Sequence, residues 1–390
     1  MMTMPLRAEP TLEQTLLLEC LRAYGAQERP DLRLFTTNVD WAALWQTALE
    51  QGVLPLLYSG LKELAPGLPP QQEMANLREL FKENSRKNLL MAAELVKVFR
   101  LLRSHSISAI PFKGPVLAVQ AYGDLLMRQF ADLDFLVGRE DIKKVEQVLS
   151  AHGYQLWHAF TPAQEKSHLK RTCEFTFLPV RGPASIDVHW RFAADYFTAN
   201  LNQFCSIEGQ EAVLLEGHAV SMLPADIMLL YLCLHGTFHL WPKLSMVCDI
   251  ARLITASPRL DWQRLLHMAA AAGLRRIFLL GLGLAQDLMA TKLPAVVATA
   301  VAADQAAKTL QEHARARLFA RHGTAPGFAE TAWFHLLAKD RFSDRVRYCC
   351  IRMFFPTIED WKVIRLPDRL YFIYFFLRLM RLSGLLPSRA

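Results

Sequence analysis

The chain has 390 residues, enough for two or three domains of ordinary size. Hydrophobic residues make up 52% of it and charged residues 21%, a balance that excludes extensive disorder and indicates a protein with large buried helices. Its formal net charge of +7 suits a polyanionic ligand, but so small an excess does not by itself indicate nucleic-acid binding.

Seven scattered cysteines without a Cys-x-x-Cys pair argue against structural zinc, and their odd number argues against a full set of disulfides. The apolar run at Leu16–Leu18 is broken at once by Glu19, so we expect no signal peptide. No apolar run reaches the roughly 18 residues of a membrane span. We therefore expect a cytoplasmic protein with reduced thiols and no stable membrane span.

The N-terminal region, residues 1–85, is predicted to be helical. Apolar residues at helical spacing predict a helix over 11–24 that ends near Gly25. Asp40 is placed to cap a second helix, and the Pro- and Gly-rich residues 65–70 precede a long helix over about 71–106. That helix leads into the first strand of the core.

In the core, residues 86–215, short strands and helices alternate. Together they indicate a mixed α/β sheet, an α+β arrangement with helical regions on both sides in the chain. Strands are predicted near 108–113, 131–137, 154–159, 173–180 and 185–192, and helices over 115–122 and 139–151.

From about residue 224 the pattern is helical throughout, with Pro224-Ala225-Asp226 as a helix start, which predicts a helical domain over 216–330. Residues 331–390 form a helical tail that we expect to pack on the body. Its aromatic stretch Leu370–Arg381 is interrupted by arginines, so a membrane-surface anchor is the alternative.

Two acidic residues alternate with apolar ones in Asp132-Leu133-Asp134-Phe135. On a strand, Asp132 and Asp134 would share one face. Adjacent carboxylates repel each other and need a counter-charge, and a hard divalent cation such as Mg²⁺ is the natural partner. The pair therefore predicts metal-assisted phosphoryl chemistry; a solvated strand edge is the alternative.

The preceding turn, Lys113-Gly114-Pro115, leads from a strand into a helix. Glycine lets the backbone come close to a ligand, and proline is favoured at the first position of a helix. A helix N-terminus suits a phosphate, to which Lys113 could add a charge. The alternative is an ordinary turn with an exposed lysine.

Other candidates lie near these motifs in the predicted fold. Arg128 could clamp a triphosphate with its planar fork, or be an ordinary surface arginine. Asp187 and His189 share a strand face, so His189 could orient a carboxylate or simply pack. His235 and His239 share a helix face and could contact a ligand at the domain interface, or pack between helices. Zinc binding is disfavoured there because Gly236 stands where a zinc-protease motif has glutamate.

In this order, the motifs resemble the DNA polymerase β-like nucleotidyltransferase superfamily, and more narrowly the bacterial family labelled uncharacterised nucleotidyltransferase. The superfamily has a glycine turn, an Asp-x-Asp strand and a third acidic residue, matched by Lys113-Gly114, Asp132 with Asp134, and Asp187. The narrower family adds an arginine before the pair, a His-containing helical segment and an Asp-Ile, matched by Arg128, Leu234–Trp241 and Asp249-Ile250. The turn departs from the usual Gly-Ser, so a hydroxyl that often touches phosphate is missing.

The resemblance implies a nucleotidyltransferase-like fold and transfer of a nucleoside monophosphate from an NTP such as ATP to a hydroxyl, with release of pyrophosphate. It implies Mg²⁺, with Mn²⁺ possible, held by the catalytic carboxylates Asp132, Asp134 and Asp187. Nucleotide contacts are expected from the remaining candidates: Lys113, Gly114, Arg128, His189, His235 and His239.

The acceptor stays open among a small molecule, a peptide or protein, and an RNA end. Long nucleic acid is possible but not favoured, because aromatic and basic residues do not alternate around the core. Two other functions remain as alternatives: a non-catalytic nucleotide-binding or regulatory protein, and a membrane-peripheral partner protein acting through its aromatic tail helix.

Overall fold

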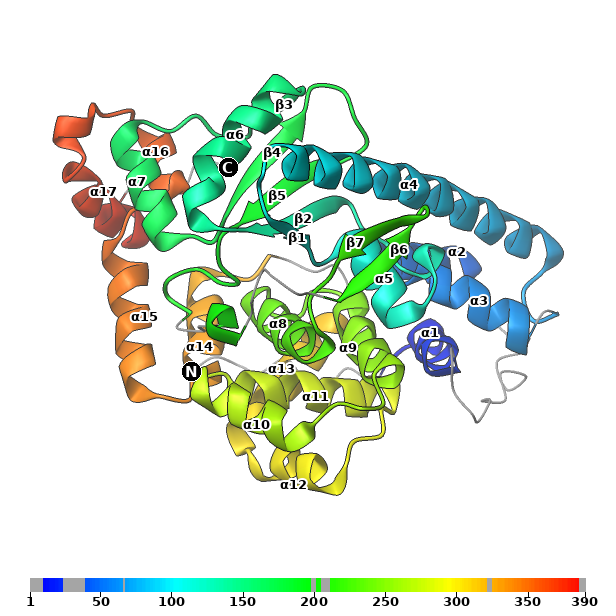
Figure 1. The fold of residues 1–390 in the computed structure, drawn as a ribbon. Helices are drawn as coiled ribbons and strands as arrows, with labels where there is room; N and C mark the ends of the chain where they lie inside the picture. Colours follow the sequence, from blue (N-terminus) through cyan, green and yellow to red (C-terminus); the bar gives the residue numbers. More distant parts are fainter. Residues whose placement is uncertain are drawn as a thin grey trace.

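A five-stranded mixed sheet lies at the centre of the protein (Figure 1). The computed structural model describes residues 10–23, 39–65, 67–197, 201–204, 211–320 and 325–385. The sheet order is β1-β2-β5-β4-β3, with β2 and β5 parallel and the other neighbours antiparallel. This confirms the predicted mixed sheet, whose strands are β1 (Ala109–Pro111), β2 (Asp132–Val137), β3 (Tyr154–Leu156), β4 (Glu174–Pro179) and β5 (Ser185–His189).

One face of the sheet is apolar and packs against two helices, α4 (Gln71–Ser104) and α6 (Ile142–Ala151). Every second residue of β2 and β5 points into this core, and Leu133, Phe135 and Ile186 are all completely buried. Alternation along each strand therefore leaves the polar residues of β2 and β5 on the opposite face.

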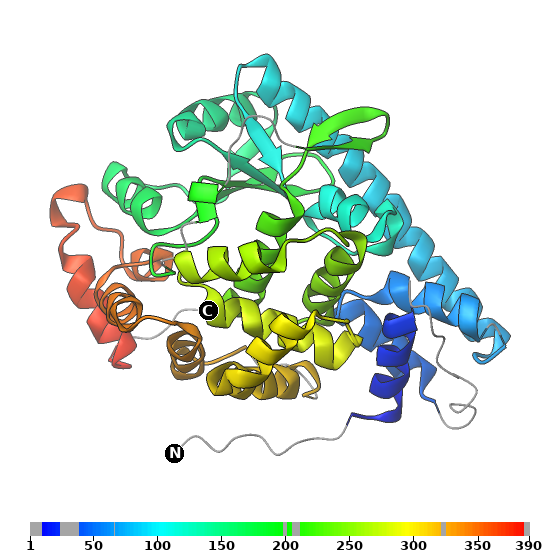
Figure 2. The ribbon, with the colours of Figure 1, turned by 60° about the horizontal axis from the view of Figure 1, so that its bottom comes forward.

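Below the sheet lies a helical half, which Figure 2 shows from its lower side. Its core also takes in the three N-terminal helices and the apolar residues Phe112 and Leu136 of the sheet region. The helices concerned are α1 (Leu12–Ala23), α2 (Trp41–Glu50), α3 (Leu54–Leu64), α8 (Ala225–Phe238), α9 (Leu244–Ala256), α10 (Trp262–Ala271), α11 (Arg275–Met289), α12 (Ala295–Ala303), α13 (Gln305–Leu318) and α14 (Phe328–Ala338).

The predicted boundary at residue 85 falls inside α4, which continues unbroken to Ser104. The division into four units therefore stays a prediction, since the packing itself forms two apolar cores.

Most elements occur where the sequence places them. Asp40 caps α2 by accepting a hydrogen bond from the Ala43 N–H at 3.0 Å, and α5 (Gly114–Tyr122) follows β1 as predicted. Gly25, the predicted end of the first helix, lies outside the described residues. The helix α7 (Pro162–Arg171) was not predicted, nor was the hairpin of β6 (Ala212–Leu215) with β7 (His218–Ser221).

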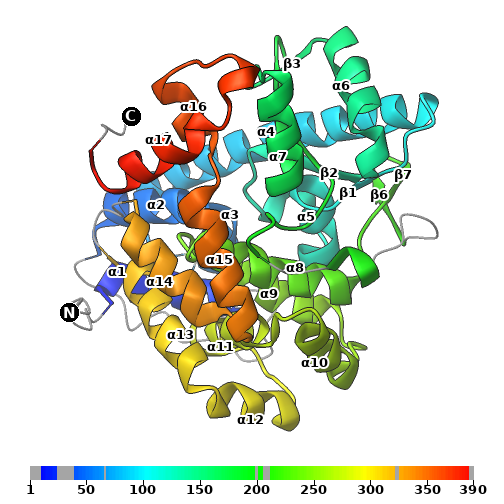
Figure 3. The same ribbon diagram turned by 90° about the vertical axis from the view of Figure 1, so that its left-hand side faces the viewer.

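The tail helices α15 (Phe342–Phe354), α16 (Ile358–Val363) and α17 (Ile373–Leu382) lie on the same side of the molecule as α7 (Figure 3). Tyr374 and Arg378 on the inner side of α17 are buried, whereas Phe372 and Phe376 are 58% and 63% exposed. The tail thus packs through one face and leaves an apolar face in solvent, so the membrane interpretation stays a prediction. Within the described ranges, no helix combines the length and apolarity needed to span a bilayer.

Candidate active site

The register of the central strands gathers the acidic residues on one face of the sheet. In the parallel pair, Asp134 of β2 lies opposite Asp187 of β5, and Asp132 lies opposite Ser185. Strand residues that lie opposite each other point to the same side. The three aspartates therefore share a face, which we call the acidic face, and it is the face turned toward the helical half.

Asp134 is the most buried member of the acidic face, with a side chain that is 0% exposed. Lys113 Nζ lies 2.6 Å from Asp134 Oδ1, and His189 Nε2 donates to the same oxygen at 3.0 Å. Burial alone would raise the pKa of Asp134, but the Lys113 charge and the His189 hydrogen bond hold that pKa well below its usual range. Asp134 is therefore ionised, and its Oδ2 is buried with no hydrogen-bond partner among the described residues.

Asp132 and Asp187 are partly buried beside this charge. Burial and then the Asp134 carboxylate raise the pKa of both side chains, to about 6 for Asp187. The Thr176 hydroxyl, which donates to Asp187 Oδ1 at 2.6 Å, opposes the rise. Lys113 thus leaves part of the negative charge of the acidic face uncompensated.

These residues fit a hard divalent cation. Oxygen ligands are what Mg²⁺ prefers, and Asp134 Oδ2 is a buried oxygen that lacks a partner among the described residues. A bound cation would also relieve the repulsion that raises the pKa of Asp132 and Asp187.

Another set of metal-binding side chains lies at the end of the acidic face. Among the described residues, Cys173, Glu174 and His189 are the group of three whose ligand atoms all lie within 4.8 Å of one another. The three aspartates do not form such a group, so they would have to turn toward one another to share an ion. Burial, followed by the Glu174 charge, raises the pKa of the Cys173 thiol well above its ordinary value, so the thiol is protonated when no metal is bound.

The turn before the acidic face needs its glycine. Gly114, the first residue of α5, has φ +51°, and a Cβ there would lie 3.3 Å from the carbonyl oxygen of Asp132. Lys113 stands at the cap position but makes no capping hydrogen bond, because its ammonium group has no acceptor for a helix N–H. Its side chain pairs with Asp134. The start of α5 is consequently a helix N-terminus beside the acidic face, the kind of place that suits a phosphate.

Arg128 has a buried partner in the helical half. Its Nε and one terminal nitrogen donate to the two oxygens of Asp249 on α9, each at 2.9 Å. The Tyr122 hydroxyl also donates to Asp249 Oδ1, at 2.8 Å. This two-pronged ion pair joins the segment before β2 to α9. A clamp on triphosphate stays a prediction, and it would require Arg128 to leave Asp249.

The two predicted histidines of α8 have different surroundings. His235 is partly buried and stacks on Tyr231, with ring centroids 5.6 Å apart. Burial, followed by the Lys113 charge, holds the pKa of His235 well below its ordinary value, so the ring is neutral and within electrostatic reach of the acidic face. His239 is exposed just after α8, with its ring centroid 4.6 Å from that of His235.

Sequence reasoning missed Glu174 and Thr176, which lie opposite His189 and Asp187 across the β4–β5 pair. The signal was present, since Glu174 and Thr176 alternate with the buried Phe175 and Phe177. The structure thus brings Lys113, Asp132, Asp134, Asp187 and His189 together with these two residues. Arg128 is paired with Asp249 instead, and His239 is exposed after α8.

A family model described as "Uncharacterised nucleotidyltransferase" matches residues 37–290. The matched span contains the acidic face, the α5 turn, the Arg128–Asp249 pair and both histidines of α8. The tail helices α15–α17 lie beyond it. Among curated proteins, none matches the chain.

Proposed function

The chain belongs to the uncharacterised nucleotidyltransferase family, and we propose from this that it moves a nucleoside monophosphate from an NTP to a hydroxyl of an acceptor. The acceptor oxygen would form a bond to the α-phosphorus as the bond to pyrophosphate breaks, and the proton of the hydroxyl would pass to the carboxylate of Asp187 and from there to solvent. The observation that carries the proposal is the β2–β5 register, which sets Asp134 beside Asp187 on one face.

In the proposal, Asp132, Asp134 and Asp187 hold Mg²⁺, or Mn²⁺ in its place. When bound, the ion would supply positive charge to the triphosphate and lower the pKa of the acceptor hydroxyl. A hard cation is supported by the unpartnered Asp134 Oδ2 and by the raised pKa of the two neighbouring carboxyls.

The protein's own groups would bind and orient the two substrates. The N–H groups at the start of α5 face the phosphate oxygens, and Lys113 adds positive charge where pyrophosphate leaves. Thr176 holds Asp187 through Oδ1, so the other oxygen of Asp187 is the one that orients the acceptor hydroxyl. His189 fixes the position of Asp134 by donating to it from Nε2.

The test is transfer of label from each of the four α-³²P NTPs, with Mg²⁺ and cell extract as the source of acceptors. We expect the unsubstituted protein to label an acceptor and release pyrophosphate. Asp132→Asn and Asp187→Asn should lower the rate about 100-fold or more, the scale of losing one transition-state charge contact. Asp134→Asn is less informative because it also removes the ion-pair partner of the buried Lys113, so a loss of activity could come from a change in the fold.

Glu140→Gln is the matched control, since Glu140 is an exposed carboxylate in the turn directly after β2. Transfer by Asp187→Asn at the unsubstituted rate would overturn the proposal. Tight NTP binding without transfer to any acceptor would favour the regulatory alternative.

A further inference from the structure

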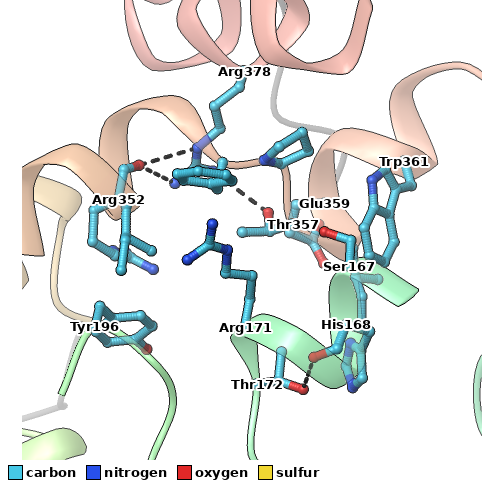
Figure 4. A pocket seen from close by; sticks show the side chains of 14 residues that line it. Ser167, His168, Arg171, Thr172, Tyr196, Arg352, Thr357, Glu359, Trp361 and Arg378 are labelled. Atoms are coloured by element: carbon cyan, nitrogen blue, oxygen red, sulfur yellow. Dashed lines mark hydrogen bonds between the residues drawn. The ribbon is translucent and has the colours of Figure 1, made fainter. Parts of the chain in front are cut away.

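A cavity of about 200 Å³ lies between α7 and the tail helices (Figure 4). It shares no residue with the acidic face. Its lining comes from two parts of the chain that are far apart in sequence: the segment with Arg171 and Tyr196, and the tail with Arg352, Phe355 and Arg378. The second part lies beyond residue 290, outside the span that the family model matches.

Three guanidinium groups border this cavity. Arg378 is held by Asp360 at 3.3 Å and donates to the carbonyl of Arg352, and Arg171 pairs with Asp195. Arg352 makes no ion pair within the described part of the chain, and its Nε is buried without a hydrogen-bond partner there. The cavity therefore contains a cation to which the described residues provide no counter-charge.

The wider surroundings are also short of negative charge. Asp195 pairs with Arg347 and lies 3.9 Å from Arg191, in addition to its pair with Arg171. Asp360 pairs with Arg381 as well as Arg378. Five arginines thus share these two aspartates, and Arg352 adds a sixth guanidinium without an ion pair among the described residues. Partly buried like charges repel strongly at short range, so an anion in the cavity would be favoured.

The lining contains one carboxylate among the described residues, Glu359. It is exposed at the side of the cavity and forms an ion pair with Lys362 at 2.9 Å. Glu359 therefore does not neutralise the three arginines.

Aromatic rings hold the guanidinium groups in place. Arg171 Cζ lies 3.6 Å from the ring centre of Phe355, and Arg352 Cζ lies 5.3 Å from that of Tyr196. A guanidinium that stacks on a ring keeps those N–H groups that are not already paired, as one of Arg171 is with Asp195, in position to donate to a phosphate or carboxylate. Figure 4 shows the ends of Arg171 and Arg352 directed toward the same space, with Tyr196 below Arg352 and Trp361 at the other side.

We propose that this cavity binds a small organic anion. Its phosphate or carboxylate group lies between Arg171 and Arg352, and its flat or apolar body lies against Phe355 and Tyr196. The site is separate from the nucleotide site and does not depend on the proposed reaction. It connects to the acidic face through the chain, because Arg171 ends α7 and Glu174 begins β4 three residues later.

Isothermal titration of the full chain with phenyl phosphate tests the proposal, with benzyl alcohol as the neutral counterpart. We expect phenyl phosphate to bind and benzyl alcohol not to bind. Arg352→Gln should weaken binding about 10- to 100-fold, the scale of a charge-assisted hydrogen bond. Arg369→Gln removes the same charge from an exposed position in the tail and should leave the affinity unchanged. No binding, or equal affinity in Arg352→Gln and the unsubstituted chain, would overturn the proposal.

Hydrogen–deuterium exchange of the unsubstituted chain gives a second test that needs no variant. Phenyl phosphate should slow exchange in α7 and α15, and a saturating non-hydrolysable NTP should not abolish that effect. If the NTP abolished the slowed exchange, phenyl phosphate would be bound at the nucleotide site, which would contradict the proposal. In the labelled-NTP assay, a rate that phenyl phosphate changes without becoming labelled would identify it as an effector and support the site, whereas label on 4-hydroxyphenyl phosphate would place that ligand at the acidic face and contradict the proposal.

Discussion

Lys113 and Asp134 have separate roles in the prediction from sequence, but in the structure they act as a pair. The sequence motifs predict that Lys113 binds phosphate and that Asp134 binds a metal. In the fold they form a buried ion pair, with Nζ and Oδ1 2.6 Å apart. Lys113, which is expected to bind the phosphate, thus also keeps Asp134 ionised. The turn that carries Lys113 must therefore hold the lysine in a defined position.

Gly114→Ala tests that turn. Left-handed backbone costs an L-residue about 1–2 kcal/mol, and the new Cβ would also lie 3.3 Å from the Asp132 carbonyl. Gly123→Ala is the control, because Gly123 also has positive φ but a Cβ added there would meet nothing within 4 Å. Urea unfolding should show a larger loss of stability for Gly114→Ala than for Gly123→Ala. Equal losses would show that the close approach to Asp132 contributes nothing.

Arg128 offers a second test at this scale. Removing one partner of a buried ion pair costs about 3–5 kcal/mol, because the other charge stays buried without compensation. Arg128→Gln should therefore lower the free energy of unfolding strongly, and adding Asp249→Asn should recover part of the loss. Urea unfolding of both single variants and the double variant measures the coupling. Strictly additive losses would contradict the structural role assigned to the pair.

Among the elements, α8 depends on Gly236, the residue that in the sequence only argued against zinc binding. A Cβ on Gly236 would lie 2.5 Å from ring atoms of Trp241, a residue that is completely buried. Gly236 therefore lets Trp241 fold back onto α8. The chain turns there through Leu240 and Trp241, both with positive φ.

Gly236→Ala should destabilise the protein by about 1–3 kcal/mol, the usual cost of overpacking a core. Trp241→Phe removes the ring atoms that the new methyl meets, so the double variant should lose less stability than the sum of the single variants. Thermal and urea unfolding provide the measurement. A Gly236→Ala protein as stable as the unsubstituted one would show that α8 can shift to make room.

The elements also show where prediction from sequence succeeds and fails. Strand alternation gave the correct face for Asp132, Asp134 and Asp187. It did not give the register, because α6, β3, α7 and β4 separate β2 from β5 in the chain and pairing depends on the whole sheet. Helix α7 was missed because its buried residues are Gln164 and His168, so it has no apolar stripe, although Thr161 and Gln164 form a capping box at its start.

The hairpin of β6 and β7 was missed for a related reason. Its turn, Glu216-Gly217, has positive φ at both positions, as a tight hairpin requires. Glutamate is uncommon at such a position, so the turn lacked its usual Asn-Gly or Asp-Gly signal. The role of Arg352 could not be predicted from the sequence either, because the cavity that it borders forms only when the tail packs on α7.

At the scale of the whole molecule, His335 of α14 joins parts of the helical half and the tail. Its ring is 3% exposed and lies 3.0 Å from the Phe238 carbonyl and 3.2 Å from the Tyr348 hydroxyl. The hydrogen-bond pattern fits a neutral ring in which Nε2 donates and Nδ1 accepts. Burial lowers the pKa of His335 to about 3, despite the hydrogen bond to Phe238.

Because the folded pKa lies below the unfolded value of 6.5, the unfolded chain binds a proton that the folded protein lacks between these values. The contribution of His335 to stability is therefore complete above about pH 6.5 and falls as the pH drops toward 3, by roughly 3–5 kcal/mol in all. Urea unfolding of the unsubstituted protein and His335→Gln between pH 7 and pH 4 should show a stability difference that shrinks on acidification. A constant difference would contradict the assignment.

The whole fold presents the acidic face of the sheet to the helical half, so that β2, β5, the start of α5 and α8 all contribute to one place. The most direct test of this arrangement is electron paramagnetic resonance of Mn²⁺ titrated into the protein with a non-hydrolysable NTP, which needs no knowledge of the acceptor. We predict Mn²⁺ binding that depends on the nucleotide and weakens at least about tenfold in Asp132→Asn and Asp187→Asn but not in Glu140→Gln. Equal Mn²⁺ binding by all four proteins would contradict the account.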